Sequence, residues 1–436
     1  MSTIVAALGG FLFGFDTAVI SGTTGALESV FELDKFALGL TVAAALIGTM
    51  IGVLGIEKPV DRFGRRLMLV IIAAVFLASA VGSAFATVWE ELLFYRFIGG
   101  LAVGGSSVVG PVYIAEIAPA KYRGRLAMMY QMNIVLGILV AFFSNYLLAE
   151  AFDGGGAWRW MLGVEAVPAA LFLAFGAFLP QSPRWLVQMH RDAEARAVLT
   201  RLGEPRVDQE LADMRRALHE DRADAPRLFQ KAYALPLLVV VVLAMFNQLS
   251  GINALMYYAP TIFEQAGFAK NAALLQAVSV GGTNVAFTVL ALFLIDRIGR
   301  RPLLMAGGAG MALSLAVVGW QFLQATPTPE VILAGLLVFI ASFAASQGAV
   351  LWVLMSEIFP NVVRGKGQAL GSFTHWTMAA VVSWTFPVLA DLAPGATFGF
   401  FALMMVGQVL FVHFIVPETK AVPLEDMEDT VGGFDD

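Results

Sequence analysis

The feature that most constrains this chain is a series of apolar stretches, each long enough to cross a membrane, that recurs along its whole length. About 20 residues of α-helix span the hydrocarbon core of a bilayer. One soluble core could not hide these stretches, because 58% of the residues are hydrophobic and only 14% are charged. We therefore predict an all-α membrane protein with twelve transmembrane helices. The expected spans are 4–20, 37–56, 67–87, 92–115, 126–148, 160–179, 235–263, 272–294, 302–323, 330–355, 368–390 and 396–416.

Lysine and arginine are distributed unequally among the connections between these spans. The even-numbered connections and the C-terminal tail hold 23 of these residues, and the odd-numbered connections hold 3. Positively charged connections stay on the cytoplasmic side, so both termini and the long central connection are predicted to be cytoplasmic. The first stretch lacks a basic leader and contains Asp16, which indicates a retained span and not a cleaved signal peptide. We expect the chain in the plasma (inner) membrane.

Three motifs occur twice, in the same order and at nearly the same offset. The offsets between the copies are 235, 241 and 237 residues. A conserved offset of this kind predicts two six-helix bundles in parallel repeat, with a substrate site between them near the bilayer midplane. The repeated motifs are DRFGRR at 61–66 and DRIGRR at 296–301, EIAP at 116–119 and EIFP at 357–360, and PQ at 180–181 and PE at 417–418.

The repeat divides the chain into four parts. The linker contains an apolar stripe at helical spacing, formed by Val207, Leu211, Met214 and Leu218, so three or four short cytoplasmic helices are expected there. The tail is acidic and is expected to be mostly solvated. The predicted parts are an N-terminal six-helix bundle at 1–179, the helical linker at 180–231, a C-terminal six-helix bundle at 232–417 and the acidic cytoplasmic tail at 418–436.

The doubled DRxGRR motif resembles that of the major facilitator superfamily. Within it, GGFLFGFDTAVISG at 9–22, QLSGIN at 248–253, the tyrosine pair at 257–258 and PQSPRW at 180–185 resemble the sugar porter family. The likeness covers essentially the whole chain. It implies the major facilitator fold and alternating-access transport of a monosaccharide, a hexose or a pentose, by proton symport. Partners implied are the sugar, protons and the lipid bilayer, with no cofactor and no nucleic acid, and we expect a functional monomer.

Asp16 and Arg96 are ionisable residues inside predicted spans, which is costly and usually functional. Each lies four residues from the outer end of its span, roughly 6 Å deep at a rise of ~1.5 Å per residue. Their pairing is therefore geometrically plausible, and we expect Asp16 to be the lone buried acid. In proton-coupled sugar porters the matching pair forms the proton switch, so the resemblance favours symport. A purely structural ion pair is the alternative.

Sugar binding calls for amides that hydrogen-bond to hydroxyls and for aromatic faces. The seventh span supplies Asn247, Gln248, Asn253 and Tyr257 around Ser250-Gly251, which is expected to break the helix. For each amide, an interhelical hydrogen bond is the alternative reading. His375 is a further candidate, since it adjoins a tryptophan of the sugar site. The positions that match sugar contacts of the family are Phe13, Gln131, Asn284, Gly348, Trp352 and Trp376.

Charged residues at the cytoplasmic ends of the spans form the predicted gate. By symmetry we expect Glu116 to pair with Arg364 and Glu357 with Arg123, across the halves. Gln181 replaces the acid usual in this family motif, which removes a charge from the network. The ordinary alternative is surface ion pairs worth ~0–1 kcal/mol each. The gate residues are Asp61, Arg65, Glu116, Arg123, Asp296, Arg300, Glu357 and Arg364.

Other classes of function fit the sequence less well. The chain has no cysteine, no P-loop, no nucleophile elbow and no HExxH motif, so we expect neither an enzyme nor a metal site. A transporter-like sugar sensor would be expected to carry a long cytoplasmic tail. The alternatives that stay open are a passive sugar uniporter and a proton symporter of polyols or cyclitols.

Overall fold

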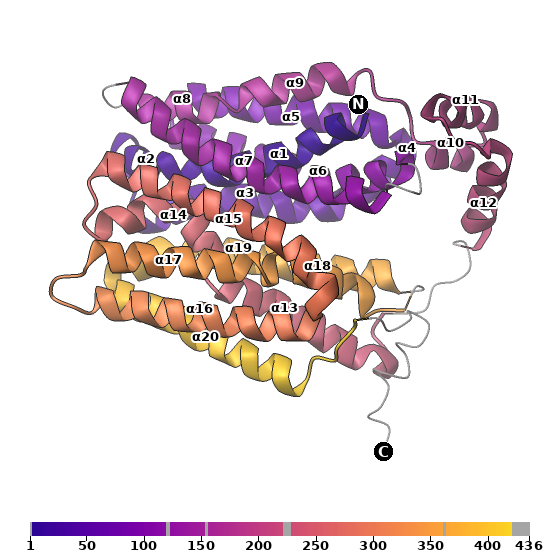
Figure 1. The fold of residues 1–436 in the computed structure, drawn as a ribbon. Coiled ribbons are helices and arrows are strands. Elements are labelled where there is room, and N and C mark those ends of the chain that lie inside the picture. The colour runs from indigo at the N-terminus through magenta and orange to yellow at the C-terminus, as the bar shows by residue number, and fades with distance from the viewer. Residues whose placement is uncertain (1, 119–122, 153–155, 221–227, 361–362, 421–436) are drawn as a thin grey trace. The chain divides into compact units, whose positions relative to one another are not determined.

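A computed structural model describes residues 2–118, 123–152, 156–220, 228–360 and 363–420. Within these ranges the chain forms α-helices and short 3-10 helices, and no strand (Figure 1). The helices up to the linker are α1 (Ser2–Val19), η1 (Ile20–Gly22), α2 (Thr24–Val30), α3 (Lys35–Gly55), α4 (Glu57–Phe63), α5 (Arg65–Phe85), α6 (Trp89–Ile117), α7 (Arg123–Ala151), α8 (Ala157–Gly163) and α9 (Ala166–Gly176).

The rest of the chain repeats this pattern after three short linker helices. The linker holds α10 (Pro183–Gln188), α11 (Asp192–Leu202) and α12 (Val207–Glu220). The second half contains η3 (Lys231–Tyr233), α13 (Ala234–Leu249), α14 (Ile252–Gln265), α15 (Lys270–Ile298), α16 (Arg300–Phe322), α17 (Pro329–Ala344), α18 (Gln347–Glu357), α19 (Arg364–Leu392) and α20 (Pro394–Phe414).

Eleven helical stretches of the described chain are long and apolar enough to cross a membrane, and they coincide with eleven of the twelve predicted spans. The remaining predicted span lies in α19, which is 29 residues long. Polar residues, His375 among them, interrupt its apolar run and lower its mean hydropathy. The span that is least apolar by composition is therefore one that was expected to contact a polar solute.

Several spans are broken. The predicted break in the seventh span lies at Gly251, which has a φ of +82° and separates α13 from α14. A Cβ at Gly251 would lie 2.5 Å from the Phe401 ring, so both conformation and space require glycine. Three irregularities were not predicted: a kink at Tyr258 two residues before Pro260, a break at Ser346 between α17 and α18, and a turn that separates α8 from α9.

Contacts divide the chain into two compact units. The first comprises Met1–Thr17, Ile47–Ile138 and Arg159–Ala225, and the second comprises Ala18–Leu46, Leu139–Trp158 and Pro226–Asp436. Short segments of the first sequence half thus belong to the second unit, as shown by the hydrogen bond of 3.2 Å between Thr24 Oγ1 and Thr261 Oγ1. The domain boundaries drawn from the sequence repeat stay a prediction.

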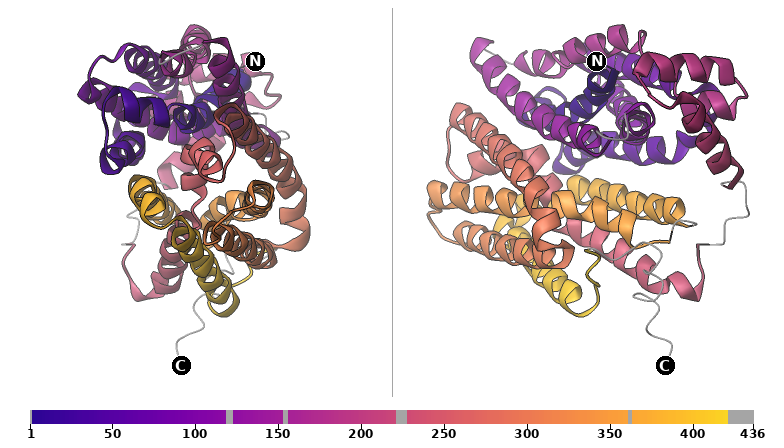
Figure 2. Two further views of the ribbon diagram at one scale, coloured as in Figure 1. Left: turned by 90° about the vertical axis from the view of Figure 1, so that its left-hand side faces the viewer. Right: turned by 45° about the vertical axis from the view of Figure 1, so that its right-hand side comes forward.

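Each unit has its own packed interior. In the first, α1 and α7 approach closely, since a Cβ on Gly14 would lie 1.9 Å from the carbonyl oxygen of Ile134, and one on Gly137 2.1 Å from that of Phe11. Such small-residue contacts let membrane helices pack backbone to backbone. In the second, α16 and α20 lie side by side (Figure 2). The linker helices bury a separate apolar cluster that contains Trp185, Leu199 and Leu211.

Candidate transport site

The first unit contains a buried ion pair. Arg96 Nη1 on α6 lies 2.5 Å from Asp16 Oδ1 on α1, and the two side chains are 2% and 4% exposed. Gly99, one helical turn after Arg96, leaves room for Ser79 of α5 next to the pair, because a Cβ on Gly99 would lie 2.3 Å from Ser79 Oγ. The structure thus brings together the two ionisable residues that the sequence placed at equal depth. A charge pair this deep is held by its own Coulomb attraction, so a change of charge on either partner alters it.

Asp16 is not the lone buried acid, which corrects the prediction. Glu165 precedes α9, is only 3% exposed and lies within electrostatic range of both Asp16 and Arg96. An acid inside the predicted span 160–179 was itself a signal that could have identified it. The buried centre therefore contains two carboxyl groups and one guanidinium. The total charge of this centre is −1 when both acids are ionised. If one of the two carboxylates binds a proton, the other can stay ionised as the partner of Arg96.

The second unit contains a cluster of amides at the break in the seventh span. Gln248 Oε1 accepts a hydrogen bond from Asn253 Nδ2 at 2.8 Å, and Gln248 Nε2 donates to Asn247 Oδ1 at 2.9 Å. Asn247 and Gln248 are 2% and 1% exposed. Because Gly251 breaks the helix between α13 and α14, the side chains of Gln248 and Asn253, five apart in sequence, bond to one another. These amides orient each other and carry more donors and acceptors than the mutual bonds use.

Aromatic rings surround the amide cluster. The Gln248 amide nitrogen lies 3.2 Å from His375 Nε2 and 3.3 Å from Nδ1 on α19. The His375 ring in turn lies 5.0 Å from the Trp352 ring and 5.0 Å from the Trp376 ring. Trp352 is 38% exposed, whereas Trp376 and Tyr257 are buried. One connected group of amides and rings from α13, α14, α18 and α19 thus joins most of the sugar-contact candidates of the second half.

The other sugar-contact candidates lie on α1, α7, α15 and the start of α18. Asn284 is buried on α15, and Gly348 lies at the start of α18, where a Cβ would be 3.3 Å from the Phe343 ring. Phe13 and Gln131 are half-buried residues of the first unit, on α1 and α7. Phe13 packs against the apolar cluster of that unit. The role of all four in one site stays a prediction.

Two buried glutamines were missed by the sequence reasoning. Gln347 Nε2 donates a hydrogen bond to Gln408 Oε1, which joins α18 to α20, and both residues are at most 2% exposed. The signal was available, since both are amides within predicted apolar spans. Interhelical hydrogen bonds of this kind hold membrane helices together. We assign the pair to the packing of α18, whose first residue is Gln347.

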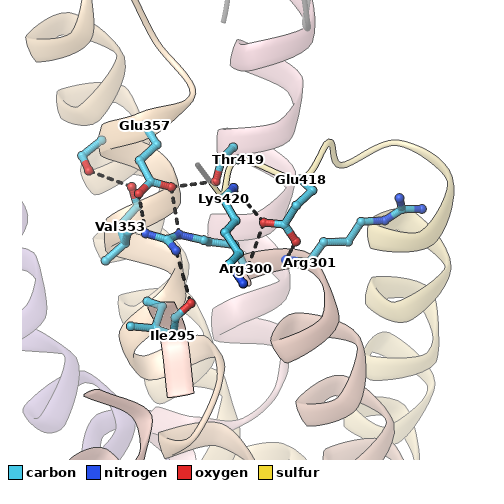
Figure 3. A network of polar contacts seen from close by, with 9 residues as sticks. Ile295, Arg300, Arg301, Val353, Glu357, Glu418, Thr419 and Lys420 are labelled. Carbon is cyan, nitrogen blue, oxygen red and sulfur yellow. Dashed lines mark hydrogen bonds and ion pairs between the residues drawn. The ribbon is translucent and has the colours of Figure 1, made fainter. Parts of the chain in front are cut away.

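The gate residues pair within their own halves. Arg65 Nε lies 3.1 Å from Glu116 Oε2 and Arg65 Nη1 lies 3.6 Å from Asp61 Oδ1. Arg300 makes two hydrogen bonds to Glu357, of 3.0 Å from Nε and 2.7 Å from Nη2 (Figure 3). These partners were not predicted, because the repeated motifs were interpreted as pairing across the halves.

The predicted gate includes three further residues, Arg364, Arg123 and Asp296. Arg364 Nη2 donates a 3.4 Å bond to the carbonyl oxygen of Phe359, at the end of α18. The side chains of Arg123 and Asp296 lie outside the described residues. The cross-pairs of Glu116 with Arg364 and of Glu357 with Arg123 stay predictions.

The surroundings of the Arg65–Glu116 pair and of the Arg300–Glu357 pair are alike: each has a glycine and a proline-containing segment nearby. Gly64 and Gly299, with φ of +83° and +105°, precede α5 and α16. Gln181 Oε1 accepts from the backbone N–H of Arg66, and the two Glu418 oxygens accept from the backbone N–H groups of Arg300 and Arg301. The twofold repeat in the sequence is thus a twofold repeat in local structure.

A family model described as "Sugar (and other) transporter" matches residues 2–430. The chain belongs to the sugar porter family of the major facilitator superfamily. Its helices therefore form the twelve-helix fold of that superfamily, and α19 contains the predicted span at 368–390.

This sugar porter is 38% identical over 468 residues to the D-xylose-proton symporter of Escherichia coli (strain K12), with 98% of this chain and 94% of the relative covered. It is 37% identical to the arabinose-proton symporter of Bacillus subtilis (strain 168), covering 97% and 93% of the two chains. The solved inward open conformation of the xylose transporter XylE from E. coli matches with a TM-score of 0.88 and 38% identity, covering 98% of this sugar porter and 99% of that chain.

Proposed function

We propose that this sugar porter moves a monosaccharide, a pentose or a hexose, together with a proton by alternating access. The observation that carries the proposal is the buried contact between Asp16 and Arg96, in a chain that is 38% identical to a D-xylose-proton symporter and 37% identical to an arabinose-proton symporter. D-Xylose is the first substrate to test. A passive facilitator has no need of a titratable acid beside a buried guanidinium.

Coupling follows from the charge on Asp16. While ionised, Asp16 accepts the hydrogen bond of Arg96 and holds α1 to α6. Protonation removes the negative charge, so the attraction between Asp16 and the guanidinium weakens, and Glu165 remains as a buried carboxylate within electrostatic range of Arg96. One pH unit is worth about 1.4 kcal/mol and 100 mV about 2.3 kcal/mol per charge. Together they support roughly 500-fold accumulation at one proton per sugar.

Sugar recognition follows from the amide and aromatic group of the second unit. Gln248 and Asn253 present paired donors and acceptors, as neighbouring sugar hydroxyls require, and Trp352 and Trp376 supply apolar faces for the ring. Buried polar groups also discriminate strongly, because a ligand without the matching hydroxyl leaves them unpaired. The Gly251 break contributes by exposing backbone and by directing the amides of α13 and α14 toward one another.

Uptake of D-xylose into proteoliposomes, with and without an inward proton gradient, tests the proposal. We expect accumulation above equilibrium only with the gradient. Asp16→Asn is expected to abolish accumulation and to retain counterflow of bound sugar, since the amide imitates the protonated acid. Asp391→Asn, an exposed acid at the end of α19, is the matched control and is expected to accumulate normally.

The outcomes separate the candidate functions. Equal uptake with and without the gradient, unchanged in Asp16→Asn, would establish a passive uniporter. Full accumulation by Asp16→Asn would reject the proton switch while leaving symport intact. A panel that includes polyols and cyclitols in the same assay tests the alternative substrate class.

Orientation and assembly are part of the proposal. The excess of Lys and Arg in the even-numbered connections supports cytoplasmic termini in the inner membrane. Labelling of single cysteines tests the orientation, because the natural chain has no cysteine. A cysteine in the linker is expected to react only from the cytoplasmic side, and one at 31–34, between α2 and α3, only from the opposite side. We propose a functional monomer, since each chain contains both halves of the repeat.

A further inference from the structure

A cavity of about 370 Å³ lies in the second unit, away from the amide and aromatic group. Its walls come from η1, α2, the outer part of α14, the start of α15 and the end of α19. None of Asn247, Gln248, Asn253, Trp352 or Trp376 lines it. The η1 and α2 segments that line the cavity come directly after the first span, whereas the linker comes after the sixth span. The cavity therefore opens on the membrane side opposite the linker.

The lining is polar and electrically balanced. It includes two carboxylates, Glu28 and Glu264, and two ammonium groups, Lys35 and Lys270. Glu28 and Lys35 neutralise each other through a contact of 2.5 Å. Net attraction for a cation or an anion is therefore small, while donors and acceptors of both kinds are abundant. Such a lining is complementary to a neutral solute with many hydroxyl groups.

Hydroxyl, amide and aromatic groups add to this chemistry. Thr24 and Thr261 share a hydrogen bond of 3.2 Å at the wall, and the Gln265 amide lies one turn further along α14. The Tyr258 and Phe386 rings, 5.3 Å apart, form an apolar side. The volume falls within the range of small-molecule sites and exceeds what water-filled packing defects occupy.

The position of the cavity relates it to the transport path. Tyr258 lines the cavity, and its sequence neighbour Tyr257 belongs to the predicted sugar site. The backbone kinks at Tyr258, with φ of −127° and ψ of 17°, so the cavity wall at 259–265 is a separate segment from the amide-bearing part of α14. A solute in the cavity would contact the part of α14 that follows the kink, while Asn253 lies on the part before it.

We propose that this outer cavity is a second, weaker monosaccharide site, which holds sugar before it reaches the amide and aromatic group. This inference rests on the proposed function, since it assigns a further site for the same class of solute. The outer site binds at least about tenfold more weakly, because an open cavity covers less of the ligand and leaves water in competition.

Filling the cavity tests the proposal. Gly25 lines it, and a Cβ at Gly25 meets no atom within 4 Å, so Gly25→Trp introduces a large ring at the cavity wall from a position where the side chain begins in open space. Gly399→Trp is the matched control, because a Cβ there also meets no atom within 4 Å and Gly399 does not line the cavity. The measurement is equilibrium binding of radiolabelled D-xylose to the purified full-length chain in lipid nanodiscs.

Wild type and Gly399→Trp are expected to show two classes of site. Gly25→Trp is expected to lose the weaker class and keep the tighter one, while Asn253→Ala loses the tighter class. Gln265→Leu, which keeps the shape of the cavity and removes one hydrogen-bonding group, is expected to weaken the weaker class about fivefold.

A single class of site in wild type, unchanged in Gly25→Trp and Gln265→Leu, overturns the outer site and leaves the proposed function standing. Absence of any D-xylose, hexose or polyol binding to wild type overturns both.

Discussion

In the second half of the chain Arg300 holds Glu357 through two hydrogen bonds, whereas in the first half Arg65 approaches Glu116 at one point. Thr419 also donates a 2.6 Å bond to the Glu357 carboxylate. Among the described residues, Arg65 Nε and Glu116 Oε2 have no hydrogen-bond partner although they lie 3.1 Å apart. Bidentate charge-assisted pairs are stronger and geometrically more specific than single contacts. The two copies of the motif therefore differ: Arg300 is bound more strongly to its glutamate than Arg65 is.

The segment that packs against each DRxGRR loop also makes stronger contacts in the second half than in the first. Glu418 places both carboxylate oxygens 3.0 Å from backbone N–H groups at the start of α16, whereas Gln181 offers one amide oxygen, at 3.1 Å, to the start of α5. A negative charge at a helix N-terminus is worth about 0.3–1 kcal/mol, and a neutral amide gains less. A cycle that opens this side of the protein would therefore release the first-half loop more easily than the second.

The largest expected effect comes from breaking the stronger pair. Glu357→Gln removes the charge and one of two acceptors from a guanidinium whose side chain is 11% exposed. We expect a loss of about 2–3 kcal/mol in unfolding free energy, below the upper range for buried pairs because Glu357 is partly exposed. Glu116→Gln is expected to cost less, about 1 kcal/mol, although Glu116 is only 9% exposed, because its contact with Arg65 Nε is not a hydrogen bond and Asp61 remains beside Arg65. Thermal unfolding in detergent measures both, with the exposed Glu330→Gln as control, and equal losses in the two halves would contradict the comparison.

The glycines of the two DRxGRR motifs, Gly64 and Gly299, allow a second comparison of the halves. A Cβ at Gly299 would lie 2.8 Å from Glu418 Oε2, and one at Gly64 2.5 Å from Gln181 Nε2. Both have backbone conformations that cost about 1–3 kcal/mol for other residues. We expect Gly299→Ala to cost about 2 kcal/mol and Gly64→Ala about 1 kcal/mol, because only the former displaces a carboxylate.

Gly203→Ala separates strain from displacement in that measurement. Gly203 also has a positive φ, +79°, but a Cβ there meets no atom within 4 Å. Its loss reports backbone strain alone. Because ψ is 26° at Gly203 and 168° at Gly299, a region that other residues avoid, Gly203→Ala gives a lower bound on the strain at Gly299. If Gly203→Ala cost as much as Gly299→Ala, the Glu418 contact would contribute nothing to the loss at Gly299.

The smallest expected effect comes from exchanging the docking residues. Gln181→Glu is expected to stabilise the chain by about 0.5 kcal/mol, and Glu418→Gln to destabilise it by about 0.5–1 kcal/mol, because each changes the charge at one helix N-terminus. Unfolding at low and at 1 M salt checks the cause, since screening reduces both effects. Destabilisation by Gln181→Glu at low salt would show that the first-half site does not favour an anion.

Much of the candidate site followed from residue type and position. The depth of Asp16 and Arg96 came from counting along two spans that cross the same bilayer, and the structure has them in contact. The Gly251 break came from glycine within an apolar run. The in-half partners of Glu116 and Glu357 did not follow, because a twofold repeat permits pairs within the halves and across them equally. Sequence symmetry cannot choose between these arrangements.

The sequence by itself determined the spans, the repeat and the types of residue at the site, because a bilayer imposes a fixed apolar length and a cost for every buried charge along each helix. Only the tertiary structure decided that Glu165 joins Asp16 and Arg96, that Gln248 links two asparagines to His375, and that a polar cavity lies beyond the kink at Tyr258. These depend on which faces of helices distant in sequence meet, and the packing of whole side chains sets that.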